Sequence, residues 1–176
     1  FHSVPLNGVA HDVSHSLDSE AFAICGDDVQ IWRPSRDAPV RIYNLGVDTI
    51  HTIKYNPIET DVLIGCCSDR SLFLFDTRQK TFLKKVTMKL RSNAVSWNPM
   101  EAFSFTCANE DYNLYTFDIR NLSEPRRVHK GHTNAVIDVD YSPTGTEFVS
   151  GSYDRSLRIF PVDSHASREI YHTRRM

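Results

Sequence analysis

A unit of about 42 residues recurs four times along this chain. An aromatic position near the end of the unit steps by 43, 42 and 43 residues, and an acidic turn position steps by 42, 42 and 43. The aromatic residues are Trp32, Phe75, Phe117 and Phe160. The acidic residues are Asp27, Asp69, Asp111 and Asp154. Chance does not keep such a register over four copies, so each copy is expected to form the same supersecondary structure.

Within each copy the residue pattern predicts four short β-strands. In the last copy, residues 135–141 alternate, a proline turn follows, and 147–152 form a second strand. A tight turn then leads into a third strand, 157–162, and the fourth falls in the segment after it. Four strands in about 42 residues are typical of a β-propeller blade. The prediction is an all-β chain with about four blades, at 8–45, 46–90, 91–132 and 133–176.

Composition excludes several other classes of protein. The chain is 40% hydrophobic and 24% charged with a net charge of -2, which is typical of a globular core and not of disorder or a coiled coil. No apolar run reaches the roughly 18 residues of a spanning helix, and the first ten residues lack a secretory signal, so we expect neither membrane insertion nor secretion. The cysteines lack zinc-site spacing and are expected to be buried, reduced thiols: Cys25, Cys66, Cys67 and Cys107.

Polar residues at fixed places in the last copy predict a buried network. Asp154 can accept hydrogen bonds from turn amides, and Ser152 and His132 are placed to join it in a relay across the blade. Asp69 and Asp111 are the matching turn residues of the two preceding copies. These positions and the period resemble the WD40 family, whose network uses His, Ser or Thr, Asp and Trp.

The resemblance implies more of the fold and also marks departures from it. WD40 propellers usually close with seven or more blades, so the chain is expected to be a fragment of a seven-bladed ring. Phe160 replaces the tryptophan, and Cys67 and Asn109 stand where Ser152 does. We therefore expect the second and third blades to depend more on apolar packing than on a relay.

Patterns that suggest catalysis are better explained by the scaffold. His129 and His132 resemble a metal pair, but no further ligand has suitable spacing and Gly131-His132 matches a blade motif. The sequence 150–152 lacks the paired glycines of a nucleophile elbow. The acidic residues recur once per blade, which favours turn chemistry over paired catalytic carboxylates. We expect no enzyme activity, no cofactor and no metal.

Basic residues concentrate in the outer segments of the predicted blades. No acid occurs between Asp76 and Glu101, and a second cluster, 126–130, contains His129. A solvated outer face is one interpretation, and a rim that meets RNA phosphates is the other. The near-neutral balance favours docking onto RNA held by neighbours over autonomous binding. The candidate RNA contacts are Lys84, Lys85, Lys89, Arg91, Arg126 and Arg127.

Two arginines recur at one blade position, in FDTR (75–78) and FDIR (117–120). Both segments resemble the Trp-Asp-x-Arg box by which some WD40 proteins dock onto the adaptor of cullin-type ubiquitin ligases. The resemblance implies a bidentate contact by the arginine and a loop held by the aspartate. Arg155 has an alternative role in its own turn. The candidate protein-contact residues are Arg70, Asp76, Arg78, Asp118, Arg120 and Arg155.

Three stretches that propeller geometry does not demand, 98–103, 109–118 and 171–176, resemble the Sof family of nucleolar WD40 proteins. That resemblance implies a non-catalytic scaffold of the small-subunit processome, working in the nucleolus with the box C/D small nucleolar RNP in pre-rRNA processing. Its implied partners are other processome proteins, small nucleolar RNA and pre-rRNA. For metazoan members it also implies a substrate-receptor role in a cullin ligase.

Overall fold

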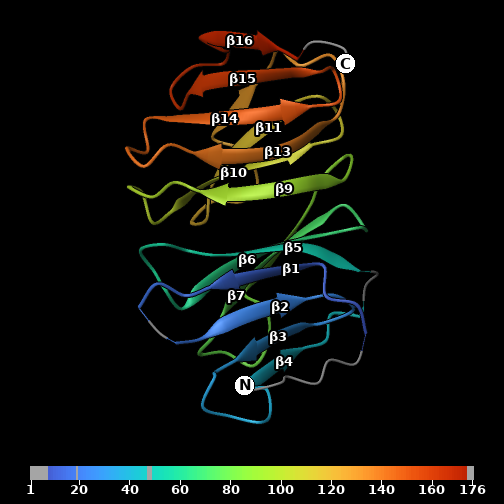
Figure 1. Cartoon of the computed structure of the whole chain (residues 1–176), viewed down its shortest axis with the longest axis vertical. Coiled ribbons are helices and arrows are strands. Elements are labelled where there is room, and N and C mark those ends of the chain that lie inside the picture. The colour runs from blue at the N-terminus through green and yellow to red at the C-terminus, as the bar shows by residue number, and fades with distance from the viewer. Residues whose placement is uncertain (1–7, 19, 47–48, 174–176) are drawn as a thin grey trace. The chain divides into compact units, whose positions relative to one another are not determined.

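The structure, a computed structural model, describes residues 8–18, 20–46 and 49–173 (Figure 1). These residues form β-strands and loops, and no helix among them is long and apolar enough to cross a membrane. The chain divides into two compact units, one ending at Thr87 and one beginning at Met88. The last three residues of the 171–176 motif lie outside the described residues.

The first unit contains two antiparallel four-stranded sheets whose strands follow chain order. The first sheet consists of β1 (Asp12–His15), β2 (Phe22–Cys25), β3 (Val29–Trp32) and β4 (Arg41–Tyr43). The second sheet consists of β5 (Ile50–Tyr55), β6 (Val62–Cys67), β7 (Ser71–Asp76) and β8 (Lys84–Thr87). Strands β6 and β7 are buried on both faces, which explains their nearly continuous apolar sequence.

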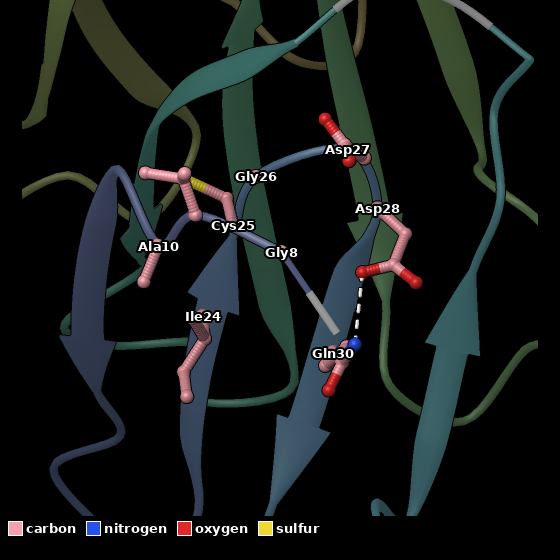
Figure 2. A pocket seen from close by; sticks show the side chains of 9 residues that line it. Gly8, Ala10, Ile24, Cys25, Gly26, Asp27, Asp28 and Gln30 are labelled. Carbon is pink, nitrogen blue, oxygen red and sulfur yellow. Dashed lines mark hydrogen bonds between the residues drawn. The ribbon is translucent and has the colours of Figure 1, made fainter. Parts of the chain in front are cut away.

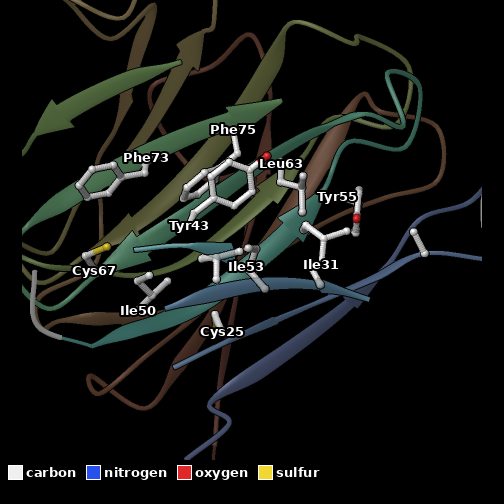
Figure 3. Close-up of a cluster of buried hydrophobic side chains, with 13 residues drawn as sticks. Cys25, Ile31, Tyr43, Ile50, Ile53, Tyr55, Leu63, Cys67, Phe73 and Phe75 are labelled. Atoms are coloured by element: carbon white, nitrogen blue, oxygen red, sulfur yellow. The ribbon is translucent and has the colours of Figure 1, made fainter. Parts of the chain in front are cut away.

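The core of the first unit lies between its two sheets (Figure 3). Ile31 and Tyr43 of the first sheet pack with Ile53, Leu63 and Phe75 of the second. Polar contacts join the sheets as well, because Ser14 Oγ accepts the Tyr55 amide at 2.9 Å. The two blades of this unit therefore form one core.

The second unit repeats this arrangement. Its first sheet consists of β9 (Ser92–Trp97), β10 (Ser104–Asn109), β11 (Leu114–Asp118) and β12 (Arg127–His129). Its second sheet consists of β13 (Val136–Tyr141), β14 (Glu147–Ser152), β15 (Ser156–Pro161) and β16 (Glu169–His172). Ala108 and Leu114 of the first sheet pack with Val139, Phe148 and Phe160 of the second. The prediction of an all-β chain built from four four-stranded blades is confirmed.

Asparagine turns end the first strand of two blades, as the Asn-Pro sequences suggest. Asn56 Oδ1 accepts the Ile58 amide at 2.9 Å, and Asn98 Oδ1 accepts the Met100 amide at 2.9 Å. Asn98 Nδ2 also donates to the Gly145 carbonyl at 3.0 Å, which joins a turn of one blade to a turn of the next. These turns fix the loops beside the candidate site described below.

Candidate functional site

The first unit has a candidate site of its own, an aspartate–arginine pair where β7 ends. Arg78 donates from Nε to Asp76 Oδ1 (2.9 Å) and from Nη2 to Asp76 Oδ2 (2.7 Å). The Arg78 amide donates to the same Oδ1 at 2.8 Å. We call this combination an arginine fork; it ties the guanidinium to the turn that carries it.

The second unit has a separate candidate site with the same geometry at the end of β11. Arg120 donates from Nε to Asp118 Oδ1 (2.9 Å) and from Nη2 to Asp118 Oδ2 (2.6 Å), and its amide donates to Oδ1 at 2.9 Å. The Arg78 and Arg120 side chains are 63% and 67% exposed. Each predicted pair is thus brought together at the surface, and its role as a partner contact stays a prediction.

The forks keep both members of each pair charged. Hydrogen bonds from Arg78 lower the pKa of Asp76, and those from Arg120 lower the pKa of Asp118. The same bonds raise the pKa of both guanidinium groups. Both pairs therefore stay ionised wherever the protein is folded near neutral pH.

The two forks differ in their third neighbour. Asp61 precedes Asp76 by 15 residues, and its Oδ2 lies 3.8 Å from Arg78 Nε. Phe103 precedes Asp118 by the same 15 residues, and its ring centroid lies 4.7 Å from Arg120 Cζ. One arginine therefore meets a second carboxylate and the other stacks on an aromatic face.

A tyrosine that the sequence analysis missed supports the first fork. Tyr43 Oη, buried at the end of β4, lies 2.9 Å from the Asp76 carbonyl and 3.0 Å from the Gln79 carbonyl. The hydroxyl thereby fixes both ends of the loop that carries Arg78. The only available signal was an aromatic residue closing an outer strand, which is too common in propellers to identify the contact.

The aspartates at the tight turns accept the amide two residues ahead in three blades. The distances are 2.9 Å for Asp69 to Ser71, 3.1 Å for Asp111 to Asn113 and 2.8 Å for Asp154 to Ser156. The residue in between has positive φ in each case: 69° for Arg70, 74° for Tyr112 and 65° for Arg155. The structure thus places Arg70 and Arg155 in strained turn positions before β7 and β15, and Arg70 lies at the opposite end of β7 from the Arg78 fork.

The last blade contains the predicted relay, with a different serine. His132 Nδ1 lies 2.9 Å from Asp154 Oδ2, and His132 Nε2 lies 2.8 Å from Ser150 Oγ. Ser156 Oγ donates to Asp154 Oδ1 at 2.6 Å. The expected member Ser152 instead donates to the Asn134 and Ala135 carbonyls, both at 2.9 Å. The assignment of Ser152 to the His132 relay was wrong. Ser152 lies two residues closer to the turn than Ser150, and it is Ser150 that reaches the histidine.

The other blades replace the histidine with other partners. Lys85 Nζ donates to Asp69 Oδ2 at 3.1 Å, and the Tyr115 hydroxyl donates to Asp111. Asn109 takes the place of Ser152 in its blade. Its Nδ2 donates to the Leu90 carbonyl at 2.9 Å, and its Oδ1 accepts the Asp111 amide at 3.1 Å. Polar contacts at the turn are therefore kept in blades without a Gly-His pair.

The candidate RNA contacts of the first unit lie on its outer strand, β8. Lys84 and Lys85 are exposed on β8, and Lys85 Nζ lies 5.0 Å from the Phe73 ring centroid in addition to its bond to Asp69. In the second unit, Arg91 pairs with Glu110 at 3.0 Å and Arg126 with Glu101 at 3.1 Å.

Arg127 Nη1 donates to the Asp163 carbonyl at 2.5 Å, and Lys89 is exposed. Five of the six candidate phosphate contacts already have an interaction within the chain: Lys84, Lys85, Arg91, Arg126 and Arg127. An RNA phosphate would have to displace those partners or share the cation with them.

His129 does not belong to the basic surface. It is fully buried on β12, where Nε2 lies 2.8 Å from Thr116 Oγ1 and Nδ1 lies 2.6 Å from the Ser164 carbonyl. The network extends from Thr116 Oγ1 to Thr106 Oγ1, which are 2.7 Å apart. Thr106 Oγ1 in turn lies 2.6 Å from Tyr141 Oη. Burial lowers the pKa of His129 to about 4, so it is neutral. This second buried network escaped the sequence analysis, which read 126–130 as a charge cluster.

Little in the described residues suits catalysis. No three His, Cys, Asp or Glu side chains among them converge on a metal site. A small pocket near the β2–β3 turn contains Cys25 and Asp28, and Gln30 Nε2 donates to Asp28 Oδ1 at 3.0 Å (Figure 2). Burial raises the pKa of the Cys25 thiol to about 12, which removes it as a nucleophile.

Comparison with known proteins matches these features to a family. The family model described as "WD domain, G-beta repeat" matches residues 123–160, from the loop before β12 to β15. Protein SOF1 of Saccharomyces cerevisiae is 47% identical over 159 residues, 90% of this chain and 32% of its own length. The chain is a homologue of Protein SOF1. DDB1- and CUL4-associated factor 13 of Danio rerio is 56% identical over 164 residues, 93% of the chain and 37% of its own length.

A third relative extends the match to nearly the whole of this chain. DDB1- and CUL4-associated factor 13 of Homo sapiens is 54% identical over 175 residues, 99% of this chain and 39% of its own length. The chain thus spans well under half the length of the curated relatives it matches. The predicted resemblance to the Sof family is confirmed.

Proposed function

We propose that this chain is part of a non-catalytic WD40 scaffold in ribosome biogenesis. In this proposal it is held in the small-subunit processome with the box C/D small nucleolar RNP, in the nucleolus, and supports processing of small-subunit pre-rRNA. The observation that carries the proposal is the 47% identity to Protein SOF1 through 90% of the chain. The match runs through 90% of the chain, loops as well as strands, so it supports shared partners as well as shared fold.

Protein contacts are proposed to hold the scaffold more than RNA contacts do. The forks present two arginines on rigid strand ends, whereas most of the candidate phosphate contacts are engaged in ion pairs within the chain. Exposed ion pairs are each worth less than about 1 kcal/mol, so each of these cations would also gain little from a single phosphate contact. Lys84 and Lys89 are both exposed and therefore accessible to RNA.

Gradient sedimentation of the full-length protein tests this role. The Lys84→Glu, Lys89→Glu variant reverses charge without removing the Lys85–Asp69 bond, and Lys84→Gln, Lys89→Gln is the matched control. We expect the wild-type protein in large pre-ribosomal particles and a partial shift of the Glu variant to lighter fractions. Absence of the wild-type protein from those particles would refute the ribosome-assembly role.

A second candidate function is the docking of a cullin-ligase adaptor, which the two forks favour. The relatives' name describes them as DDB1- and CUL4-associated. We propose that the forks contact DDB1 and that the protein acts as a substrate receptor. Capture of purified DDB1 by the full-length protein is expected to be lost in Arg78→Ala, Arg120→Ala, and retained capture would exclude the forks as the docking site.

A further inference from the structure

A residue with a hydroxyl group follows each fork arginine at the same distance along the chain. The two segments are Arg78-Gln-Lys-Thr81, between β7 and β8, and Arg120-Asn-Leu-Ser123, between β11 and β12. A basic side chain three residues before a serine or threonine is a charge pattern by which protein kinases select their targets. Neither hydroxyl has a role in the proposed function, and the structure of the two loops distinguishes between them.

The loop that contains Thr81 is open to solvent over a long stretch. Every residue from 78 to 85 is exposed. Arg78 keeps 63% of its side chain exposed although its Nε and Nη2 bind Asp76. Within the part of the chain that the structure describes, the Thr81 hydroxyl takes part in no hydrogen bond. Its oxygen is therefore available as a phosphoryl acceptor.

Backbone hydrogen bonds hold this loop at its ends and not in its middle. The Gln79 amide donates to the Asp76 carbonyl at 2.9 Å, and the Leu83 amide donates to the Leu74 carbonyl at 2.7 Å. Among the described residues, no hydrogen bond holds the segment 80–82 between these two anchors. This segment can therefore extend into a kinase cleft without breaking the sheet beside it.

Phe82 is the side chain that such an extension would disturb. Its ring packs edge-on against the Phe73 ring, with the centroids 5.1 Å apart, and it is 39% exposed. Apolar contacts in the kinase cleft would have to replace this packing. Because the ring is already partly in solvent, the replacement concerns one face of one side chain.

The loop that contains Ser123 is closed in comparison. Ser123 Oγ donates to Asn121 Oδ1 at 2.5 Å, and the Ser123 amide lies 3.3 Å from the same oxygen. Leu122, directly before it, is buried with 9% exposure. A kinase would have to pull Leu122 into solvent to bind the residues around the serine. The same charge pattern is therefore accessible at Thr81 and blocked at Ser123.

We infer that Thr81 is a phosphorylation site for a protein kinase that reads basic residues ahead of its target, with Arg78 and Lys80 as the recognition residues. The kinase transfers the γ-phosphoryl group of ATP to Thr81 Oγ1. The bond from the γ-phosphorus to the β,γ-bridging oxygen breaks, and the bond from the phosphorus to Oγ1 forms. ADP leaves, and the hydroxyl proton passes to the catalytic aspartate of the kinase.

Phosphorylation would roughly halve the positive charge of this outer segment. Residues 77–87 contain four cationic side chains and no acidic one, a formal charge of +4. A phosphate group brings about −1.5 to −2 near pH 7. The strand β8 would then attract RNA phosphates less strongly. This consequence, unlike the modification itself, rests on the proposed RNA contacts.

Phosphorylation of the folded, full-length protein tests the inference. The protein is incubated with Mg²⁺, ATP and the catalytic domain of a calmodulin-dependent protein kinase, which selects an arginine three residues before its target, and mass spectrometry locates the phosphate. We expect phosphate on Thr81, at a rate that falls by roughly tenfold in Arg78→Gln and is unchanged in Ser123→Ala. Thermal melting checks that each variant is folded. A peptide of residues 74–88, with and without Arg78→Gln, separates recognition of the arginine from changes in the loop.

Phosphorylation of the peptide without phosphorylation of Thr81 in the folded protein would overturn the inference, because the loop would then be closed to a kinase. Phosphate on Ser123 in place of Thr81 would overturn it too. So would equal rates for the peptides with and without Arg78→Gln.

The charge consequence is measured by titrating a fragment of small-subunit precursor RNA with the phosphorylated and unphosphorylated protein. We expect at least about threefold weaker binding and a less steep salt dependence after phosphorylation. Kinase-treated Thr81→Val is the matched control and should bind like the untreated protein. Unchanged affinity after phosphorylation would overturn the consequence and leave the modification standing. Failure of both forms to bind RNA would instead contradict the proposed RNA contacts.

Discussion

His132 Nδ1 lies 2.9 Å from Asp154 Oδ2, and neither side chain has more than 7% exposure. Burial lowers the pKa of His132, so the ring is neutral near pH 7. The neutral ring then donates from Nδ1 to Asp154 and accepts at Nε2 from Ser150. This tautomer satisfies every buried polar atom of the contact, which makes the pair the polar centre of the last blade.

Removing the histidine should therefore destabilise the second unit strongly. His132→Ala leaves the buried Ser150 hydroxyl without its partner and is expected to lower the free energy of unfolding by about 2–4 kcal/mol. Ser152→Ala is the control, because its hydroxyl bonds only backbone groups, and should cost about 1 kcal/mol. Urea unfolding measures both. Equal losses from the two variants would contradict the assignment of Ser150 to the relay.

Stability should fall as the solution becomes mildly acidic. His129 has a folded-state pKa of about 4, below the 6.5 of an exposed histidine, so the unfolded chain binds more protons between these values. The contribution of neutral His129 to the free energy of unfolding, up to about 3 kcal/mol, is complete above pH 6.5 and is lost as the pH falls toward 4. His129→Phe should flatten this part of the pH profile. An unchanged slope in that variant would contradict the neutral buried histidine.

Gly145→Ala tests the joint between the last two blades. Gly145 has a φ of 68°, and an added Cβ would lie 2.4 Å from Asn98 Oδ1 and 2.8 Å from Met100 Cγ. We expect a loss of about 2–4 kcal/mol from backbone strain and displacement of the buried Asn98. Gly46 has a similar φ of 61° with open space around it, so Gly46→Ala should cost only about 1 kcal/mol. Equal decreases in melting temperature for Gly145→Ala and Gly46→Ala would contradict the steric explanation.

Arg155→Gly and Arg70→Gly test whether these arginines serve their turns or a partner. Both have left-handed backbone conformations, which glycine adopts without strain, so stability should be unchanged or rise by up to about 1 kcal/mol. DDB1 capture should also stay within about twofold of wild type, because both arginines lie in turns that do not include either fork. Loss of capture with normal melting would identify the turn arginines as contacts.

The repeat was enough to predict the fold. Regular spacing of Asp69, Asp111 and Asp154 fixed the turns, and the strands followed from alternation between them. Ser152 was misassigned because the register between β13 and β14 shifts at Val136 to Asp138, which spacing along one strand does not reveal. At that end of the strand Ser152 reaches backbone carbonyls, and Ser150 reaches the histidine.

The candidate site was predictable in position and unpredictable in its surroundings. Matching sequences at 75–78 and 117–120 located both arginines. Their unlike neighbours, Asp61 and Phe103, lie 15 residues before the fork aspartates, in the turns just ahead of β6 and β10, so only the pairing of those strands with β7 and β11 brings them to the forks. His129 was misread for a related reason. On the outer strand β12 its side chain points into the core although it lies within a cluster of basic residues.

Crosslinking followed by RNA sequencing on the full-length protein, purified from nuclear extract, is the most direct test of the scaffold role. Wild type is compared with the Lys84→Glu, Lys89→Glu variant, and co-purified proteins are identified in the same samples. The account predicts small-subunit processome proteins together with box C/D small nucleolar RNA and small-subunit precursor RNA, with the RNA crosslinks reduced in the variant. Recovery of neither those RNAs nor processome proteins would contradict it.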